Sequence, residues 1–288
     1  MITLDLDNAV DLRQCRGVIT PHSYPPYLEA FTFPGGEEHI KIHCFAGYGR
    51  GTEVTLIARL RSSRDVMRML LAVEACRRRD WKVYGYIPYV PYARQDRVMV
   101  PGESFSLGMF LRLLKLAAFE AVAFFDPHSD VTTAIADVIG LPVHIISNTA
   151  IVSDLLHELE HPLLVAPDAG AAKKLAKQFP FQEIVTADKT RDLNTGRITK
   201  YAVHGDVKER VCLVVDDICD GGATFKMLAE ALTEGGAKEK HLFVSHGIFS
   251  QGLHPLNHLY NSVATTDSFY NRNESPKPRI ITLPQLIF

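Results

Sequence analysis

The chain of 288 residues lacks several features that mark particular classes of protein. No apolar run approaches the length of a membrane-spanning helix, and the first residues include acids without a basic segment, so we expect neither a membrane anchor nor a signal peptide. Its five cysteines form no Cys-x-x-Cys pair, which favours a reducing cytoplasm over a disulfide or zinc framework. The formal net charge is only −2, so no overall field attracts nucleic acid or an anionic membrane. Any anion site must therefore be local.

The sequence instead shows a regular alternation of short apolar strands with amphipathic helices. A hydrophobic content of 47% with 22% charged residues is typical of a globular protein. Strands are expected at residues 53–58, 82–87, 121–125, 143–146, 162–166, 183–187, 211–215 and 241–245, with helices near 64–79, 105–115, 148–159 and 225–232. Residues 31–42 are typical of a hairpin. We predict an α/β fold of two similar domains, residues 1–143 and 144–288, each with a mainly parallel sheet.

The most informative stretch begins at Val211 and combines a buried strand with a glycine-rich turn. Asp216 and Asp217 stand where the strand ends, and the turn Asp220-Gly221-Gly222-Ala223-Thr224 opens the next helix. Backbone N–H groups at a helix start bind anions, and glycines allow a close approach. Carboxylates accept hydrogen bonds from vicinal hydroxyls. The stretch predicts a sugar-phosphate site, with a purely structural turn as the alternative. Cys219, inside this turn, is expected to fill space rather than to react.

Polar segments follow other expected strands. Arg94-Gln95-Asp96-Arg97 lies in a loop after residue 87 and suits a polyphosphate, with a solvated rim as the alternative. Asp126-Pro127-His128-Ser129 follows the strand at 121–125, and Asp168 follows the strand at 162–166. Because ligands gather outside the carboxyl ends of parallel strands, these segments are candidate site residues. Residues 188–197 are polar and predict a mobile loop or hairpin arm, whose cations Lys189 and Arg191 would close over a phosphoryl group unless the segment is simply a solvated turn.

Together these motifs resemble the ribose-phosphate pyrophosphokinase family, also called phosphoribosyl pyrophosphate (PRPP) synthetases, over nearly the whole chain. That family has the type I phosphoribosyltransferase fold. The string Tyr92-Ala93-Arg94-Gln95-Asp96-Arg97 is the most specific motif, because simple phosphoribosyltransferases lack it. The other similar segments are Phe33-Pro34-Gly35-Gly36-Glu37 (adenine, contributed by a neighbouring subunit), Asp126-Pro127-His128 (metal and ATP), Pro167-Asp168 (ribose and metal), Asp188 to Arg191 (catalytic arm) and Asp216 to Thr224 (pentose phosphate).

The resemblance implies transfer of pyrophosphate from Mg-ATP to the C1 hydroxyl of ribose 5-phosphate, which gives PRPP and AMP. It implies catalysis by Lys189, Arg191 and His128, and Mg²⁺ ligation by Asp126, His128 and Asp168. ATP would be held by Phe33, Glu37, Arg94, Gln95, Asp96 and Arg97. The ribose phosphate would be held by Asp168, Asp216, Asp217, Asp220, Gly221, Gly222, Ala223 and Thr224. A homo-oligomer, at least a dimer, is expected, with no nucleic-acid or membrane partner.

Two departures from the family pattern leave alternatives open. Gly35 replaces the usual aspartate of the adenine segment, and the pentose loop has one hydroxyl fewer than the usual Asp-Thr-Gly-Gly-Thr. A slimmer loop has room for a larger acceptor, so the same chemistry on ADP-ribose, in NAD salvage, is the main alternative. A non-catalytic PRPP synthetase-associated subunit is a second alternative, and a phosphoribosyltransferase that consumes PRPP is the least favoured.

Overall fold

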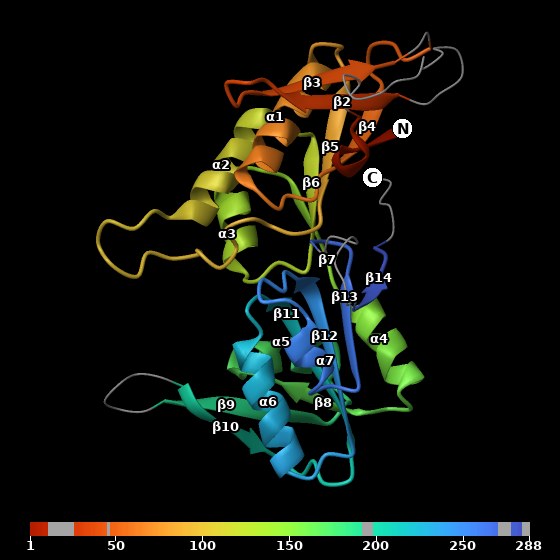
Figure 1. Ribbon diagram of the computed structural model, residues 1–288. Coiled ribbons are helices and arrows are strands. Elements are labelled where there is room, and N and C mark those ends of the chain that lie inside the picture. The colour runs from red at the N-terminus through yellow and green to blue at the C-terminus, as the bar shows by residue number, and fades with distance from the viewer. Residues whose placement is uncertain (11–25, 45–46, 192–197, 270–277, 284–288) are drawn as a thin grey trace. The chain divides into compact units, whose positions relative to one another are not determined.

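The computed structural model describes residues 1–10, 26–44, 47–191, 198–269 and 278–283 (Figure 1). The chain divides into two compact units, residues 1–146 and residues 147–283. The expected domain boundary after residue 143 falls inside a strand that pairs within the first unit. Across the described ranges, no helix is long and apolar enough to cross a bilayer.

Unit 1 is built on a five-stranded sheet in which every pairing is parallel, in the order β1-β4-β5-β6-β7. Its strands are β1 (Ile2–Asp5), β4 (Glu53–Ile57), β5 (Lys82–Ile87), β6 (Ala121–Phe125) and β7 (Val143–Ile146), and its helices are α1 (Ser63–Arg77), α2 (Ser106–Ala117) and α3 (Val131–Val138). A short 3₁₀ helix covers Leu6–Asn8, and β2 (Tyr27–Thr32) pairs with β3 (Glu38–His43) as a separate antiparallel hairpin.

Helix α1 shows why these sequences form these elements. Ser62 caps its start, because the Ser62 hydroxyl accepts the N–H of Asp65 at 3.3 Å. One face of the helix is buried against the sheet at helical spacing, through Val66, Met69, Ala72, Val73 and Cys76. The helix also contacts the hairpin strand β3 and helix α2.

A buried carboxylate fixes the hairpin on α1. Glu38 has a side chain only 5% exposed, and it contacts Arg68 Nε at 2.5 Å and Arg64 Nε at 3.2 Å. It also accepts the Thr32 hydroxyl at 2.8 Å. Burial alone raises the pKa of Glu38, but the hydrogen bonds and charges, those of Arg68 above all, outweigh burial and leave the pKa lowered.

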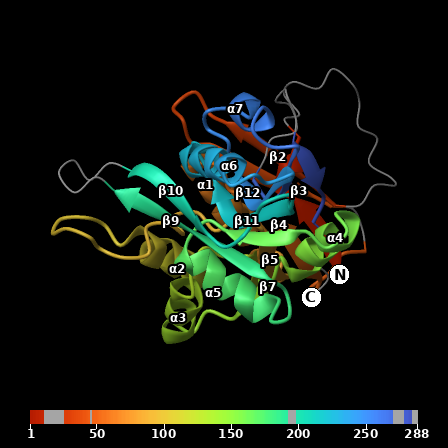
Figure 2. The ribbon, with the colours of Figure 1, turned by 90° about the horizontal axis from the view of Figure 1, so that it is seen from below.

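Unit 2 is built on a seven-stranded sheet in the order β10-β9-β8-β11-β12-β13-β14. Figure 2 labels strands β9, β10, β11 and β12 of this sheet. All pairings are parallel except that of β10 with β9 at one edge. The strands are β8 (Leu163–Ala166), β9 (Ile184–Arg191), β10 (Ile198–His204), β11 (Val211–Cys219), β12 (Glu239–Gly247), β13 (Ser262–Thr266) and β14 (Arg279–Ile281). The helices are α4 (Thr149–Glu158), α5 (Ala169–Gln178), α6 (Ala223–Glu234) and α7 (His254–Asn257).

The predicted α/β class with mainly parallel sheets is confirmed. Of the alternatives for the polar stretch from Asp188 onward, the described part forms a hairpin arm, because β9 and β10 pair from Thr186 opposite His204 to Arg191 opposite Ile198. Residues 192–197 lie outside the described residues. Elements α3, α7, β13 and β14 were not expected from the sequence.

Candidate functional site

Two carboxylates stand near the end of the central strand β11. Asp216 and Asp217 are half-buried, after four fully buried residues of the same strand. Asp216 Oδ1 accepts the N–H of Asp217 at 2.9 Å, and Asp217 Oδ1 accepts the N–H of Ile218 at 2.9 Å. Each carboxylate is thereby oriented by the backbone next to it.

A third carboxylate lies close to this pair. Asp168 follows β8, which pairs in parallel with β11, so both strands end at the same edge of the sheet. Asp168 caps α5, where its Oδ1 accepts the N–H of Ala171 at 3.0 Å. Burial raises the pKa of Asp216 well above its usual value, and the charges of Asp217 and Asp168 raise it further. Such a cluster favours hydroxyl donors as its partner.

The glycine turn leads from these carboxylates into α6. Gly222 occupies the position before the helix with φ +75°, a left-handed conformation that favours glycine. No side chain caps this helix start, which leaves its first N–H groups directed at the turn. Asp220 is held from outside the turn, because it accepts the Ser250 hydroxyl at 2.6 Å. An uncapped helix start beside a glycine turn suits a phosphate.

Cys219 belongs to the support of this turn and not to its chemistry. It is fully buried, and burial raises the pKa of its thiol to about 12. Its carbonyl accepts the N–H groups of Ile248 and Phe249, at 2.9 and 3.1 Å. The expectation that Cys219 fills space is confirmed.

In unit 1, the loop after β5 places one of the predicted ATP residues inside the protein. Asp96 is only 7% exposed and takes the Arg97 guanidinium in two contacts, Nε at 2.9 Å and Nη2 at 3.2 Å. Arg97 lowers the pKa of Asp96, and the nearby Ser129 and His128 lower it further. Asp96 therefore lies close to His128 and fixes Arg97, whose side chain is largely exposed. Contact of Asp96 itself with a nucleotide stays a prediction.

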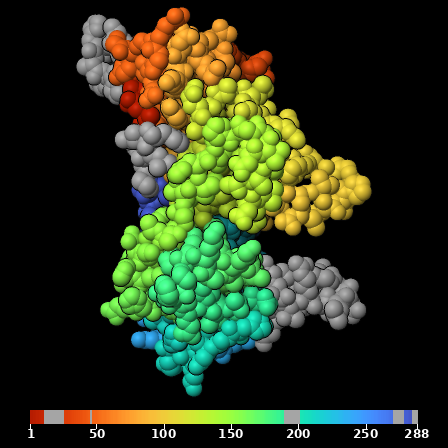
Figure 3. Space-filling model, turned by 180° about the vertical axis from the view of Figure 1, so that it is seen from behind, coloured from red at the N-terminus to blue at the C-terminus, as the bar shows by residue number. Residues whose placement is uncertain are grey.

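The same loop continues to an apolar tip that the sequence analysis did not single out. Val98, Met99 and Val100 are each more than half exposed. The Glu103 carboxylate accepts the N–H groups of Met99 and Val100, at 2.8 and 3.1 Å, which holds the tip in a defined turn. The segment projects from the surface of unit 1 (Figure 3). In the sequence, three adjacent apolar residues before the turn-forming Pro101-Gly102 could have indicated this exposed tip.

Asp126 stands at the end of β6 in a strained backbone conformation. It is 2% exposed and has φ +43°, which costs a non-glycine residue roughly 1–2 kcal/mol. Its N–H donates to the carbonyl of Ile146 at 2.9 Å. His128, two residues further along the chain, is exposed.

The predicted metal ligands do not form one set within the described residues of either unit. Asp126 and His128 belong to unit 1, and Asp168 belongs to unit 2. No group of three or more His, Cys, Asp or Glu side chains suited to a metal occurs among the described residues. The grouping of these three ligands stays a prediction.

The predicted adenine segment is the turn between β2 and β3. Phe33 is 46% exposed and packs edge-on against Phe31, with ring centroids 4.9 Å apart. A Cβ atom on Gly35 would lie 2.7 Å from Glu37 Oε2, so the Glu37 side chain occupies the space above Gly35. Any side chain at position 35 would have to displace the Glu37 carboxylate.

The predicted catalytic arm is described in its backbone. Lys189 pairs with Tyr201 and Arg191 with Ile198 in the β9–β10 ladder. The side chains of Lys189 and Arg191 lie outside the described part of the chain. Their neighbour Asp188 is exposed and pairs with His204, Oδ2 to Nε2, at 3.1 Å.

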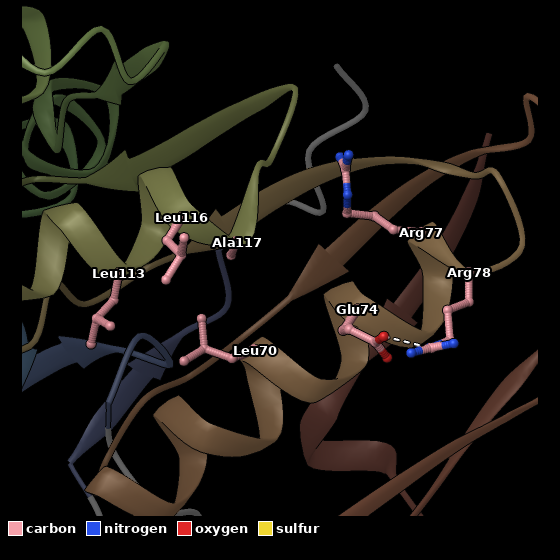
Figure 4. Close-up of a pocket in the computed structure, with 7 residues that line it drawn as sticks. All are labelled: Leu70, Glu74, Arg77, Arg78, Leu113, Leu116 and Ala117. Atoms are coloured by element: carbon pink, nitrogen blue, oxygen red, sulfur yellow. Dashed lines mark hydrogen bonds and ion pairs between the residues drawn. The ribbon is translucent and has the colours of Figure 1, made fainter.

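A cavity of about 490 Å³ lies elsewhere, between α1 and α2 (Figure 4). Leu70, Glu74, Arg77 and Arg78 of α1 and its end, with Leu113, Leu116 and Ala117 of α2, line it. No predicted site residue is among them. The carboxyl-terminal halves of both helices lie toward the end of the sheet where its strands begin, opposite the edge that carries Asp126.

Comparison with known proteins identifies the family. No protein-family model matches the chain. The ribose-phosphate pyrophosphokinase of Thermococcus kodakarensis is 28% identical over 268 residues, 90% of each chain. That of Vibrio vulnificus is 31% identical over 231 residues, 76% of this chain and 72% of the relative. That of Buchnera aphidicola is 33% identical over 227 residues, 74% of this chain and 69% of the relative.

Among solved structures, phosphoribosylpyrophosphate synthetase from Mycobacterium smegmatis has the same fold, with a TM-score of 0.74 and 24% identity over 89% of this chain and 85% of that chain. The relatives from Vibrio vulnificus and Buchnera aphidicola are more than 30% identical and match over more than two thirds of their own length. The chain therefore belongs to the ribose-phosphate pyrophosphokinase family.

Proposed function

We propose that the chain transfers the β,γ-pyrophosphate of Mg-ATP to the C1 hydroxyl of ribose 5-phosphate, with PRPP and AMP as products. The observation that carries this proposal is the carboxylate cluster of Asp168, Asp216 and Asp217 next to the uncapped start of α6. A pentose phosphate offers both matching groups, vicinal hydroxyls as donors and a dianion.

In this proposal, unit 2 binds the acceptor, ribose 5-phosphate. The ribose hydroxyls donate to Asp216 and Asp217, which lowers the repulsion within the cluster. The 5-phosphate accepts from the N–H groups at the start of α6 and from the hydroxyl of Thr224. Gly221 and Gly222 leave room for that phosphate, because neither brings a side chain into the turn.

In this proposal, unit 1 binds the donor, ATP. Arg94, Gln95 and Arg97 bind the ATP phosphates, and Asp96 keeps Arg97 in position. The exposed ring of Phe33 stacks on the adenine, and Glu37 accepts from its exocyclic amine. The resemblance assigns this turn to the site of a neighbouring chain, so the proposal includes a homo-oligomer of at least two copies.

The ATP substrate implies Mg²⁺, which prefers oxygen ligands and retains several waters. Asp126, His128 and Asp168 would hold it, and when bound it neutralises charge on the ATP phosphates. Lys189 and Arg191 add positive charge at the transferred group, and a cation in that role contributes roughly 10³–10⁵ to the rate in related phosphoryl transfers. Closure of the β9–β10 arm excludes water from the reaction.

The alternatives are less well supported. The relatives carry the name of ribose-phosphate enzymes, and no comparison supports ADP-ribose as the acceptor. A non-catalytic subunit has no physical need for Lys189, Arg191 and the loop carboxylates. A cytoplasmic location is part of the proposal, and it is supported by Cys44, Cys76, Cys212 and Cys219, which are free thiols.

The proposal is tested by AMP release from Mg-ATP with ribose 5-phosphate as acceptor. Lys189→Ala should lower turnover by about 10³ or more while circular dichroism stays unchanged. Lys177→Ala, at the exposed end of α5, is the matched control and should leave turnover unchanged. Equal turnover in both variants would remove Lys189 from catalysis, and an inactive wild type with either acceptor would refute the proposed function.

A further inference from the structure

Helix α7 carries two histidines one helical turn apart. His254 is its first residue, and His258 follows its last residue with helical backbone angles. Both side chains are exposed. Their rings are 4.4 Å apart between centroids, and their Nε2 atoms are 3.1 Å apart. The function proposed above uses neither residue.

This spacing matches two ligands of one metal ion. Imidazole nitrogens lie about 2.0–2.1 Å from a transition metal, and angles of roughly 90–110° at the metal place two such nitrogens about 2.8–3.4 Å apart. The observed separation of 3.1 Å lies within that window. The same separation also accommodates a simple N–H···N hydrogen bond, which a metal replaces once both Nε2 atoms are deprotonated.

We propose that His254 and His258 form a binding site for a divalent transition metal such as Zn²⁺, Co²⁺ or Ni²⁺. Imidazole suits these ions better than Mg²⁺, and neither histidine is among the residues proposed to bind Mg-ATP, so the site is separate from Mg-ATP binding. The described residues supply no third protein ligand, so water completes the coordination. An exposed site with two imidazoles binds weakly enough to respond to the concentration of free metal.

The position of the site gives binding a structural consequence. Leu256 lies between the two histidines in sequence and is 1% exposed. Its Cδ1 is 3.5 Å from the point where a Cβ on Gly222 would be, so it packs under the glycine turn. Helix α7 also contacts α6 and β13 (Figures 1 and 2). A metal that joins residues 254 and 258 therefore restrains the support of the turn at residues 220–224.

Calorimetric titration of the full chain with Zn²⁺, in a buffer without chelator and with Mg²⁺ present, tests the site. His254→Ala and His258→Ala should each weaken one zinc-binding event by about tenfold or more. Even the loss of an outer-shell partner lowers metal affinity 10–100-fold. His157→Ala is the matched control, because His157 and His161 on and after α4 form a second ring pair with centroids 5.6 Å apart. Titrations that are identical for the wild type and both α7 variants would overturn the site.

Two further measurements separate binding from its consequence. X-ray absorption of the zinc-loaded His157→Ala protein should show two imidazole nitrogens, and one or none would overturn the proposal. Amide hydrogen exchange at residues 220–224 should slow on addition of Zn²⁺ in the wild type and stay unchanged in His258→Ala. Unchanged exchange in a wild type that binds zinc would overturn the coupling to the turn. Neither readout requires catalysis, so both are independent of the proposed function.

Discussion

Replacement of Asp216 by asparagine should stabilise the protein and impair its activity. Asp216 is half-buried beside Asp217 and Asp168, and these charges and burial raise its pKa. Asparagine removes the charge and keeps an oxygen that can accept the N–H of Asp217, the bond that Asp216 Oδ1 makes at 2.9 Å. We expect a gain in the free energy of unfolding of about 1 kcal/mol, which corresponds to roughly 2–4 °C in Tm for a chain of this size class.

The gain in stability from Asp216→Asn should be larger at neutral pH than in acid. Because the folded pKa of Asp216 lies above its unfolded value, the ionised group destabilises the folded state at neutral pH. As pH falls through the folded pKa, the wild type takes up a proton and the destabilisation disappears. The difference in Tm between Asp216→Asn and wild type should therefore be largest at neutral pH and should shrink in acid.

Scanning calorimetry from pH 4 to 8 and AMP release at pH 7.5 measure the two effects. Loss of a charged acceptor for a sugar hydroxyl costs about 1.5–3 kcal/mol, which is roughly a 10- to 150-fold loss of kcat/KM for ribose 5-phosphate. Asp154→Asn, at an exposed position of α4, is the control and should change neither quantity. A less stable Asp216→Asn protein at neutral pH, or a pH-independent gain, would refute the account of the cluster.

Three further predictions concern the supports of the two units. Gly222→Ala should destabilise the chain by about 1–2 kcal/mol, because Gly222 has a φ of +75°. Gly221→Ala should change the free energy of unfolding by no more than about 0.5 kcal/mol, and equal denaturation midpoints for the two variants would contradict this prediction. Arg68→Ala should lower the free energy of unfolding by roughly 2–3 kcal/mol at pH 7, because the buried Glu38 carboxylate loses a partner. Since the pKa of Glu38 is lowered in the folded state, this loss should become smaller as the pH falls and Glu38 takes up a proton, which denaturation at several pH values measures. Cys219 should resist alkylation in the folded protein at neutral pH, since its pKa is raised to about 12; labelling as fast as in the unfolded chain would contradict its burial.

The sequence was sufficient to predict the apolar parallel strands. Strands β5, β6 and β7 have the expected bounds, because each is a short apolar run interrupted by Pro, Asp or Gly. Strand β13 was missed because its polar composition conceals its burial. Its Thr265 and Thr266 are fully buried, and the Thr266 hydroxyl is satisfied by the carbonyl of Ser245 at 2.6 Å. Such a partner is visible only in the folded chain.

The sequence predicted part of the candidate site as well. Carboxyl ends of neighbouring parallel strands share one edge, which is why Asp168 could be expected beside Asp216. The buried position of Asp96 against Arg97 was not predictable, because an acid in a polar loop is usually solvated. The histidine pair of α7 gave a spacing signal, His-x-x-x-His, but a helix of four residues has no periodicity to reveal it.

Phosphorus NMR of the reaction mixture tests the central claim most directly. With Mg-ATP and ribose 5-phosphate, the account predicts equal amounts of AMP and a product that carries a pyrophosphate on C1. Appearance of ADP with a singly phosphorylated sugar would contradict pyrophosphate transfer, and AMP formation with ADP-ribose but not with ribose 5-phosphate would contradict the assigned acceptor.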